Sequence, residues 1–239
     1  MSKYNCIFRR YEIKYMVTAQ QRQAILEAME PYMLPDKFGV STICNVYYDT
    51  PESLLVRRSL EKPMYKEKLR LRSYGPAAPS TEVFVELKKK YRDVVYKRRV
   101  SMREAEAEGY LAGAQAENPC QITREIDYFM KSYDGIAPAM YIAYDRTAFC
   151  GREDDGFRVT FDENILWRSV ELTLDSEVYG EELLPPETSI MEIKTLGAIP
   201  LWMTHTLCRL GVYKTSFSKY GNAYRELTTK PVKGRCFCA

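Results

Sequence analysis

Charged and apolar residues alternate along several segments of this chain, and this period of two constrains the fold more than any other feature. Three segments contain Glu-x-Lys tripeptides, namely Glu12 to Lys14, Glu86 to Lys88 and Glu192 to Lys194. A fourth segment carries basic residues at every second position from Lys66 to Arg72. Because successive side chains of a strand point to opposite faces, each segment predicts a strand with one charged and one apolar face.

The polar faces of these expected strands are rich in Arg and Lys over five or six segments. A solvated sheet face is the ordinary explanation for any single copy of the pattern. Clustered like charges repel one another unless an anion neutralises them, and guanidinium groups suit bidentate contacts with phosphate. The repetition therefore favours a wet, basic surface that binds a polyphosphorylated anion.

The carboxylates of the three tripeptides indicate a divalent metal beside this anion. Polyphosphates are usually handled with Mg²⁺ or Mn²⁺, which prefer oxygen ligands. Glu192, Glu86 and Glu12 are the candidate metal ligands. The alternative is that each carboxylate pairs with its neighbouring lysine. The sequence has no P-loop, so side chains rather than a glycine-rich loop are expected to hold the phosphates.

Length and composition indicate one soluble, cytoplasmic domain. The chain has 239 residues and a formal net charge of only +3, which argues against a strongly basic nucleic-acid binder. Seven cysteines without paired spacing and a single histidine argue against a disulfide framework or a zinc site. The sequence shows no signal peptide and no apolar run of the ~20 residues that a membrane span needs.

The order of predicted elements indicates an α+β domain with a mainly antiparallel sheet. Capping-box patterns at Thr18/Gln21 and Ser101/Glu104 predict two helix starts, and Gly211 predicts a helix end. The expected strands cover residues 7–17, 40–48, 65–74, 83–90, 93–100, 139–149, 156–162 and 189–195. We expect residues 1–228 to form a single domain and residues 229–239 to form a loosely ordered tail.

Several motifs together resemble the polyphosphate polymerase domain of the vacuolar transporter chaperone (VTC) family, a group of CYTH-like triphosphate tunnel metalloenzymes. The motifs occur in family order and cover nearly the whole chain. They are Tyr11-Glu12-Ile13-Lys14-Tyr15, Tyr47-Tyr48-Asp49-Thr50-Pro51, Lys68 to Gly75, Glu86-Leu87-Lys88, Tyr144 to Phe149, Phe157 to Thr160, Glu192-Ile193-Lys194 and Ser218-Lys219-Tyr220. The resemblance implies a closed antiparallel β-barrel of about eight strands, with short helices packed outside and a tunnel lined by the charged faces.

The resemblance also implies a reaction and a set of site residues. ATP and inorganic polyphosphate would be the substrates, and Mn²⁺ or Mg²⁺ the cofactor. The expected catalytic residues are Lys14, Arg70, Arg72, Lys88, Arg146, Arg158, Lys194 and Lys219. The expected substrate-binding residues are Lys68, Lys90, Ser218 and Lys214. Glu192 is the best candidate metal ligand, followed by Glu86 and Glu12.

Two departures from the family pattern keep alternatives open. Ser216 and Phe217 stand where the family often has another lysine before the Ser-Lys pair, so either Lys214 replaces that lysine or one phosphate contact is missing. CYTH-type phosphatases usually begin with Glu-x-Glu-x-Lys, whereas Arg10 precedes Glu12 here, which favours a polymerase over an inorganic or nucleoside triphosphatase. A non-catalytic polyanion-binding module is the third hypothesis. A membrane partner and the oligomeric state stay open.

Overall fold

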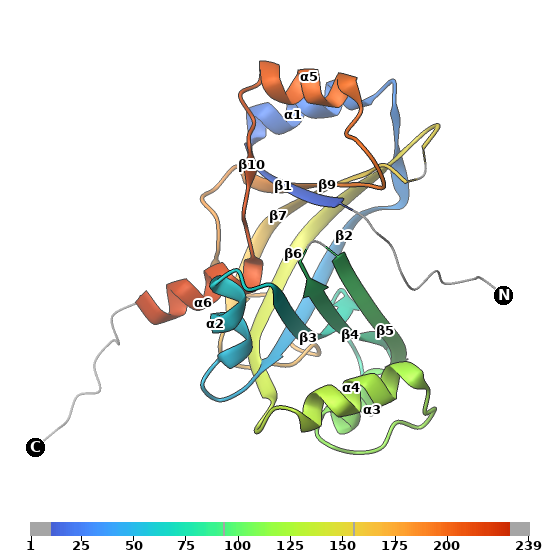
Figure 1. Ribbon diagram of the computed structural model, residues 1–239, viewed down its shortest axis with the longest axis vertical. Coiled ribbons are helices and arrows are strands. Elements are labelled where there is room, and N and C mark those ends of the chain that lie inside the picture. The colour runs from blue at the N-terminus through green and yellow to red at the C-terminus, as the bar shows by residue number, and fades with distance from the viewer. Residues whose placement is uncertain (1–10, 93, 155, 230–239) are drawn as a thin grey trace, which may run out of the picture.

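The computed structural model describes residues 11–229 apart from residues 93 and 155, and these residues form one antiparallel sheet with helices around it (Figure 1). Of the predicted tail, Thr229 ends the last helix and residues 230–239 lie outside the described residues, as does the beginning of the first predicted strand. The strands are β1 (Tyr11–Thr18), β2 (Met33–Asp49), β3 (Tyr65–Tyr74), β4 (Glu82–Tyr91), β5 (Val94–Arg103), β6 (Ala137–Gly151), β7 (Arg158–Arg168), β8 (Glu181–Glu182), β9 (Thr188–Thr195) and β10 (Lys214–Thr215).

Six helices connect or follow these strands in the described part of the chain. They are α1 (Ala19–Met29), α2 (Leu54–Leu60), α3 (Glu104–Leu111), α4 (Gln121–Lys131), α5 (Leu201–Arg209) and α6 (Lys219–Thr229). The Thr18/Gln21 capping box starts α1 as predicted, and Gly211 follows α5 with a positive φ. No helix in this part of the chain is long and apolar enough to cross a membrane.

The prediction that Ser101 and Glu104 cap a helix was wrong. Ser101 lies in β5, where it pairs with Phe84 of β4, so the strand continues to Arg103. Helix α3 begins at Glu104 without a side-chain hydrogen bond from its N-cap residue. The cross-strand pairing of the hairpin therefore prevails over the local capping pattern.

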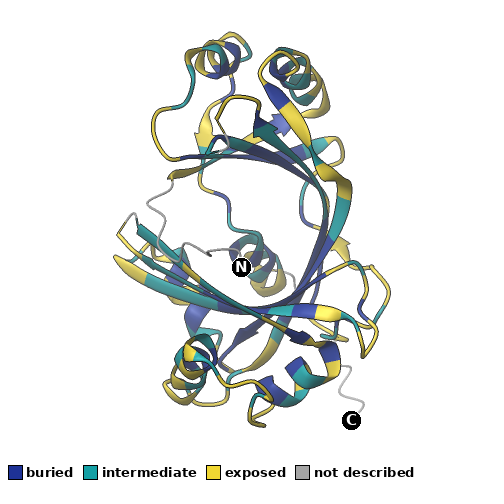
Figure 2. Cartoon of the chain, turned by 90° about the vertical axis from the view of Figure 1, so that its right-hand side faces the viewer, coloured by how far each residue is buried: buried dark blue, intermediate teal, exposed yellow. Residues whose placement is uncertain are grey.

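The sheet is curved but not closed, which corrects the expected eight-stranded barrel. Its ten strands follow the order β10-β1-β9-β7-β6-β2-β3-β4-β5, with β8 beside β7, so β10 and β5 are edges (Figure 2). The two extra strands are only two residues long and carry no alternation that a sequence pattern could show. In place of backbone pairing across the opening, Lys88 of β4 reaches Glu12 of β1 in an ion pair of 2.8 Å.

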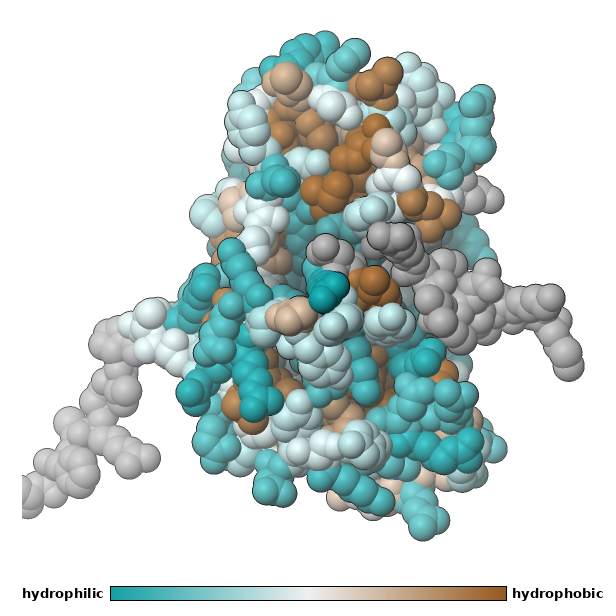
Figure 3. Space-filling model, viewed as in Figure 1, coloured by the Kyte–Doolittle hydropathy of each residue, from teal (hydrophilic) through white to brown (hydrophobic). Residues whose placement is uncertain are grey.

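Helices cover the convex face of this curved sheet in two places. Helices α1 and α5 pack on β1, β7 and β9 around Ile25, Val159 and Met203. Helices α3 and α4 pack on β3 and β4 around Leu87 and Phe129. The two groups lie at opposite ends of the molecule in Figure 1, and the surface between them is largely hydrophilic in Figure 3. Burial of these apolar clusters fixes which face of the sheet remains for charged residues.

Helices α2 and α6 instead pack together at one end of the concave side (Figure 1). Asp49 joins them, because its buried carboxylate accepts hydrogen bonds from the backbone of α2 at Leu55 and Val56 and from the Tyr220 hydroxyl of α6. Apolar residues of β2 and β6 form a third apolar cluster with these helices and with Phe217, which lies just before α6. The two helices therefore limit the concave side at one end and bring the start of α6 against the charged strand faces.

Candidate functional site

The strand register brings the charged faces together on the concave side of the sheet. Directly paired residues of antiparallel strands share a face, and the pairing runs across β1, β9, β7, β6, β2, β3, β4 and β5. We call this surface the concave face. Its charged members include Glu12, Lys14, Lys66, Lys68, Arg70, Arg72, Glu86, Lys88, Lys90, Lys97, Arg99, Arg146, Arg158, Asp162, Glu192 and Lys194.

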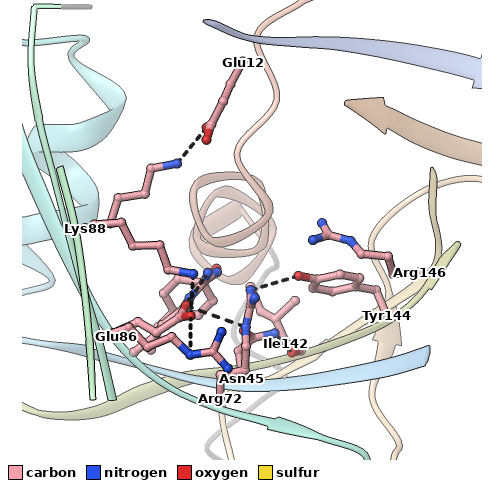
Figure 4. Close-up of polar contacts among 12 residues, drawn as sticks. Glu12, Asn45, Arg72, Glu86, Lys88, Ile142, Tyr144 and Arg146 are labelled. Carbon is pink, nitrogen blue, oxygen red and sulfur yellow. Dashed lines mark hydrogen bonds and ion pairs between the residues drawn. The ribbon is translucent and has the colours of Figure 1, made fainter. Parts of the chain in front are cut away.

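Glu86 organises the basic residues on β3 and β5 (Figure 4). Only 1% of its side chain is exposed, and its two oxygens lie 2.6 Å from Arg70 Nη2 and 2.6 Å from Lys97 Nζ. Arg72 and Arg99 follow at 3.7 Å. Burial alone would raise the pKa of this carboxyl, but Arg70, Arg72 and Lys97 hold it well below its usual range. Both oxygens are thus engaged by cations, so Glu86 fits a structural role better than metal binding.

Asp162 organises the basic residues in the other half of the concave face. Its buried carboxylate accepts two hydrogen bonds from Arg146, of 2.6 and 2.7 Å, and a third from Lys219. Burial opposes ionisation, but Lys219 and Arg146 outweigh it and keep the pKa of Asp162 well below its usual range. Because Arg146 comes from β6 and Lys219 from α6, this one carboxylate fixes a sheet cation relative to a helix cation.

Glu192 is the carboxylate that remains available on the concave face. Its closest cation is Lys194, at 3.9 Å, and within the described residues it accepts no hydrogen bond. Burial would raise its pKa, but Lys194, Lys14 and Lys88 lower the pKa to about 2. Thr160, paired with Glu192 across β7 and β9, has a buried hydroxyl without a hydrogen-bond partner in the described structure.

Glu192 and Thr160 are the residues that could hold the metal ion implied by the family resemblance. The described residues hold no cluster of three or more His, Cys, Asp or Glu side chains that could bind a metal alone. Mg²⁺ is usually bound through one or two carboxylates together with substrate phosphates and water. An ionised Glu192 beside the unpartnered Thr160 hydroxyl fits that requirement, so a metal would depend on the phosphates for its remaining ligands.

Cations outnumber carboxylates on the concave face, and this excess contributes to lowered pKa values of its lysines. Burial, reinforced by Lys14, Lys66 and Lys88, lowers the pKa of Lys68 to about 7. Burial also lowers the pKa of Lys14 to about 8, with only partial compensation by Glu192. Their protonated forms therefore lack enough neighbouring negative charge, a deficit that a bound polyanion would supply.

The start of α6 completes this surface. Lys68 Nζ donates to Ser218 Oγ at 2.9 Å, and Lys14 Nζ donates to the Phe217 carbonyl at 2.8 Å. Ser218 Oγ also accepts the Gly221 amide, so this side chain caps the helix. The positive end of the α6 dipole and the Lys219 ammonium consequently meet the lysines of β1 and β3.

Tyr144 lies among the cations of this region, between Arg146 and Arg72 (Figure 4). Arg72 donates to its hydroxyl at 3.2 Å, and the Lys219 ammonium lies 4.2 Å from its ring centroid. Burial would raise the pKa of Tyr144, but Arg146, Arg72 and Lys219 lower it to about 8. This tyrosine thus links the two networks, since its hydroxyl accepts a hydrogen bond from Arg72 and its ring contacts Lys219.

The structure brings most of the predicted site residues together. Lys88 is engaged by Glu12, and Arg158 by Asp36 at 2.9 Å, so both reach the concave face already paired. Lys90 also faces this side, opposite Lys66. Lys214 is the exception: it pairs with Tyr15 of the convex face and is exposed. The structure therefore does not bring it to the predicted phosphate contact.

Sequence reasoning missed four residues of this surface. Asp162 and Thr160 lie on β7, where only Arg158 was chosen, and Lys97 and Arg99 lie on β5. The alternation of Lys97 and Arg99 was a usable signal, since both fall at every second position of a predicted strand. Asp162 also shares the alternation of Arg158 and Thr160, but its role as the partner of Arg146 and Lys219 gave no local signal, because both residues are distant in the sequence.

Comparisons with known proteins identify the same family as the sequence motifs did. The model of the VTC domain matches residues 9–228. Subunit 4 of the vacuolar transporter chaperone complex from Trypanosoma cruzi is 24% identical over an alignment that covers 92% of this chain and 34% of that protein. This chain therefore spans about one third of the length of that relative.

Solved structures agree on the fold. A proposed adenylate cyclase from Bacillus halodurans superposes with a TM-score of 0.55 at 12% identity, covering 89% of this chain and 95% of that one. A proposed adenylyl cyclase from Hippeastrum, described as having a dominant triphosphatase activity, gives a TM-score of 0.52 at 16% identity, covering 93% and 98%. At these identities the likeness concerns the antiparallel α+β fold. The family match over residues 9–228 shows that this chain belongs to the VTC domain family.

Proposed function

We propose that this domain is a metal-dependent polyphosphate polymerase, which transfers the γ-phosphate of ATP to a growing inorganic polyphosphate chain. One observation carries the proposal: the continuous concave face has a large excess of cations, and burial lowers the pKa values of Lys68 and Lys14 without enough neighbouring carboxylate to offset it. An extended polyanion supplies that charge at several positions at once. The resemblance of the motifs to the VTC polyphosphate polymerase domain supports the choice of substrates.

The chain's own residues act by positioning and by neutralising charge. Phosphoryl transfer passes through a loose transition state, so a preorganised set of cations can supply most of the catalysis. Glu86 holds Arg70 and Arg72 in place on one side, and Asp162 holds Arg146 and Lys219 on the other. An oxygen of the terminal phosphate of the polyphosphate attacks the γ-phosphorus of ATP as the bond from that phosphorus to the ADP oxygen breaks. No side-chain nucleophile is needed.

Glu192, with the Thr160 hydroxyl beside it, would hold the metal. When bound, Mn²⁺ or Mg²⁺ would neutralise phosphate oxygens near the bond that breaks. Lys194 and Lys14 keep Glu192 ionised, which is the form that binds a cation. Glu12 and Glu86 are weaker candidates, since Lys88 engages the first and four cations surround the second.

A triphosphatase with the same site is the second candidate, and the open side of the sheet favours it. The side chains of Lys88 and Lys97, which border the opening, are 40% and 43% exposed. Solvent therefore reaches phosphate-binding positions, and water could replace the polyphosphate oxygen as the nucleophile. The two reactions share ATP and the cations but differ in their products.

An assay of products distinguishes these functions. The purified domain is incubated with ATP and Mn²⁺, with and without a short polyphosphate primer, while polyphosphate, ADP and free phosphate are measured. Long polyphosphate with matching ADP supports the polymerase, whereas free phosphate without polyphosphate supports the triphosphatase. Absence of turnover with both Mn²⁺ and Mg²⁺ contradicts either reaction and favours a polyanion-binding module.

Glu192→Gln is the informative variant in this assay. It keeps the size of the side chain but removes the charge that would hold the metal, so turnover should fall about 100-fold or more. ATP binding without metal should be as tight or tighter, because a repelling carboxylate is gone. Glu182→Gln, an exposed position on β8, is the matched control and should keep full activity. A Glu192→Gln enzyme with normal turnover would contradict the assigned role.

A further inference from the structure

Five aromatic side chains of the described strands lie on the concave face, and they differ in accessibility. Tyr47, Tyr144 and Trp167 are buried, and all three belong to the apolar cluster beneath α2 and α6. Phe84 is half-buried, and Tyr74 is 54% exposed. Only these last two can present an aromatic surface to a ligand on this face.

Phe84 and Tyr74 lie toward the end of the concave face that is remote from α6. On β3, Lys68 contacts Ser218 at the start of α6, whereas Arg72, the residue opposite Phe84, lies four positions further along the strand. At 3.3 Å per residue this separation is about 13 Å. Phe84 therefore lies level with Arg72, the last of the basic residues of β3 when these are followed outward from α6.

Arg99 connects this aromatic pair to the Glu86 network. Its guanidinium carbon lies 3.4 Å from the centroid of the Phe84 ring, while its Nε lies 3.7 Å from Glu86 Oε1. Tyr74 supports the Phe84 ring from its edge, with centroids 5.9 Å apart. The Phe84 ring and the Arg99 guanidinium thus form a two-layer stack beside the arginines that are expected to bind phosphate.

We propose that Phe84, Arg99 and Tyr74 form a platform on which the nucleobase of the phosphate donor stacks. Bases stack on aromatic rings and on guanidinium planes alike, with little dependence on base identity. Phe84 is two residues from Glu86, so the platform lies about 7 Å from the Arg70–Glu86 pair, and a ribose can bridge that gap. This inference rests on the proposed function and adds a preference for nucleoside triphosphates of any base over tripolyphosphate.

Binding measurements without added divalent metal test the platform, because turnover then does not consume the ligand. ATP, GTP and tripolyphosphate are titrated into the wild-type domain and the Phe84→Leu variant. Leucine keeps the apolar contact but has no π-face. The Kd of both nucleotides should rise about tenfold, while that of tripolyphosphate should change by less than about twofold. Tyr128→Leu, an exposed position on α4, is the control and should change neither.

Arg99→Lys provides a second variant, which keeps the charge near Glu86 and removes the plane. It too should weaken nucleotides more than tripolyphosphate. Equal weakening of all ligands, or no weakening, in both variants overturns the platform and leaves Phe84 as a packing residue. The product assay is read separately: a selective loss of nucleotide binding in a domain that makes no polyphosphate keeps the platform and refutes the polymerase.

Discussion

Replacing Lys68 with arginine keeps a cation on the concave face but removes a group that titrates near neutral pH. The pKa of Lys68 falls from 10.5 to about 7, mainly because of burial and then because of Lys14, Lys66 and Lys88. One pKa unit corresponds to about 1.4 kcal/mol, so protonating Lys68 in the empty site at pH 8.5 costs about 2 kcal/mol. A bound triphosphate offsets this cost by pairing with the ammonium.

ATP binding above pH 7 should therefore be coupled to proton uptake. The Kd for ATP should rise about tenfold for each pH unit above the pKa of Lys68, because the binding-competent protonated form becomes that much rarer. The charge of ATP itself changes little in this range, since phosphate groups lose their second proton near pH 6. Lys14, whose pKa is about 8, should steepen the dependence above that pH.

Calorimetry measures this coupling directly. ATP is titrated at pH 8.5 in two buffers that differ in their enthalpy of ionisation, and the difference in heat gives the protons taken up. The wild-type domain should take up about one proton more than Lys68→Arg. Lys131→Arg, an exposed position at the end of α4, should behave like the wild type. Equal proton uptake by wild type and Lys68→Arg would refute the assignment of a near-neutral pKa to Lys68.

Three further predictions concern the charge networks. Asp162→Asn should lower the free energy of unfolding by about 3–5 kcal/mol, because Arg146 and Lys219 lose a buried partner; a change below about 1 kcal/mol in denaturant unfolding would contradict this. Glu86→Gln should destabilise the ligand-free domain by a similar amount. Tripolyphosphate should nevertheless raise the Tm of this variant more than that of the wild type, because more cations lack an anionic partner. An equal rise in Tm argues against the excess of positive charge. The ligand-free domain should become more stable from pH 7 to pH 9, because lysines with lowered pKa values bind fewer protons in the folded than in the unfolded state; a Tm that falls over this range in thermal unfolding would contradict the sign.

The local sequence predicted the strands better than it predicted their closure. Alternation places Arg70 and Arg72 on one face whatever the partner strand, so the charged surface could be predicted before its neighbours were known. Whether the sheet closes depends on pairing between its edge strands β5 and β10, which are distant in the sequence, and here the side chains of Lys88 and Glu12 bridge the opening. No local pattern encodes that outcome.

The site followed the same rule. Residues whose place on the concave face follows from strand alternation, such as Lys14 and Arg146, were predicted to lie there. Glu86 was predicted as a metal ligand, but cations of β3 and β5 surround it. That arrangement depends on how β4 pairs with β3 and β5, which the local sequence does not specify. Asp162 was missed because its partners come from β6 and α6. Roles that depend on tertiary pairing therefore needed the structure.

The most direct test of the proposed polymerase follows phosphate from ATP into its product. ATP labelled on the γ-phosphate is supplied with Mn²⁺ and primer, and label in polyphosphate is compared with the ADP formed. A polymerase should place one labelled phosphate in polyphosphate for each ADP, and the Glu192→Gln variant should lose both products. Label that appears only as free phosphate, in amounts equal to ADP, would refute the proposed polymerase and establish hydrolysis instead.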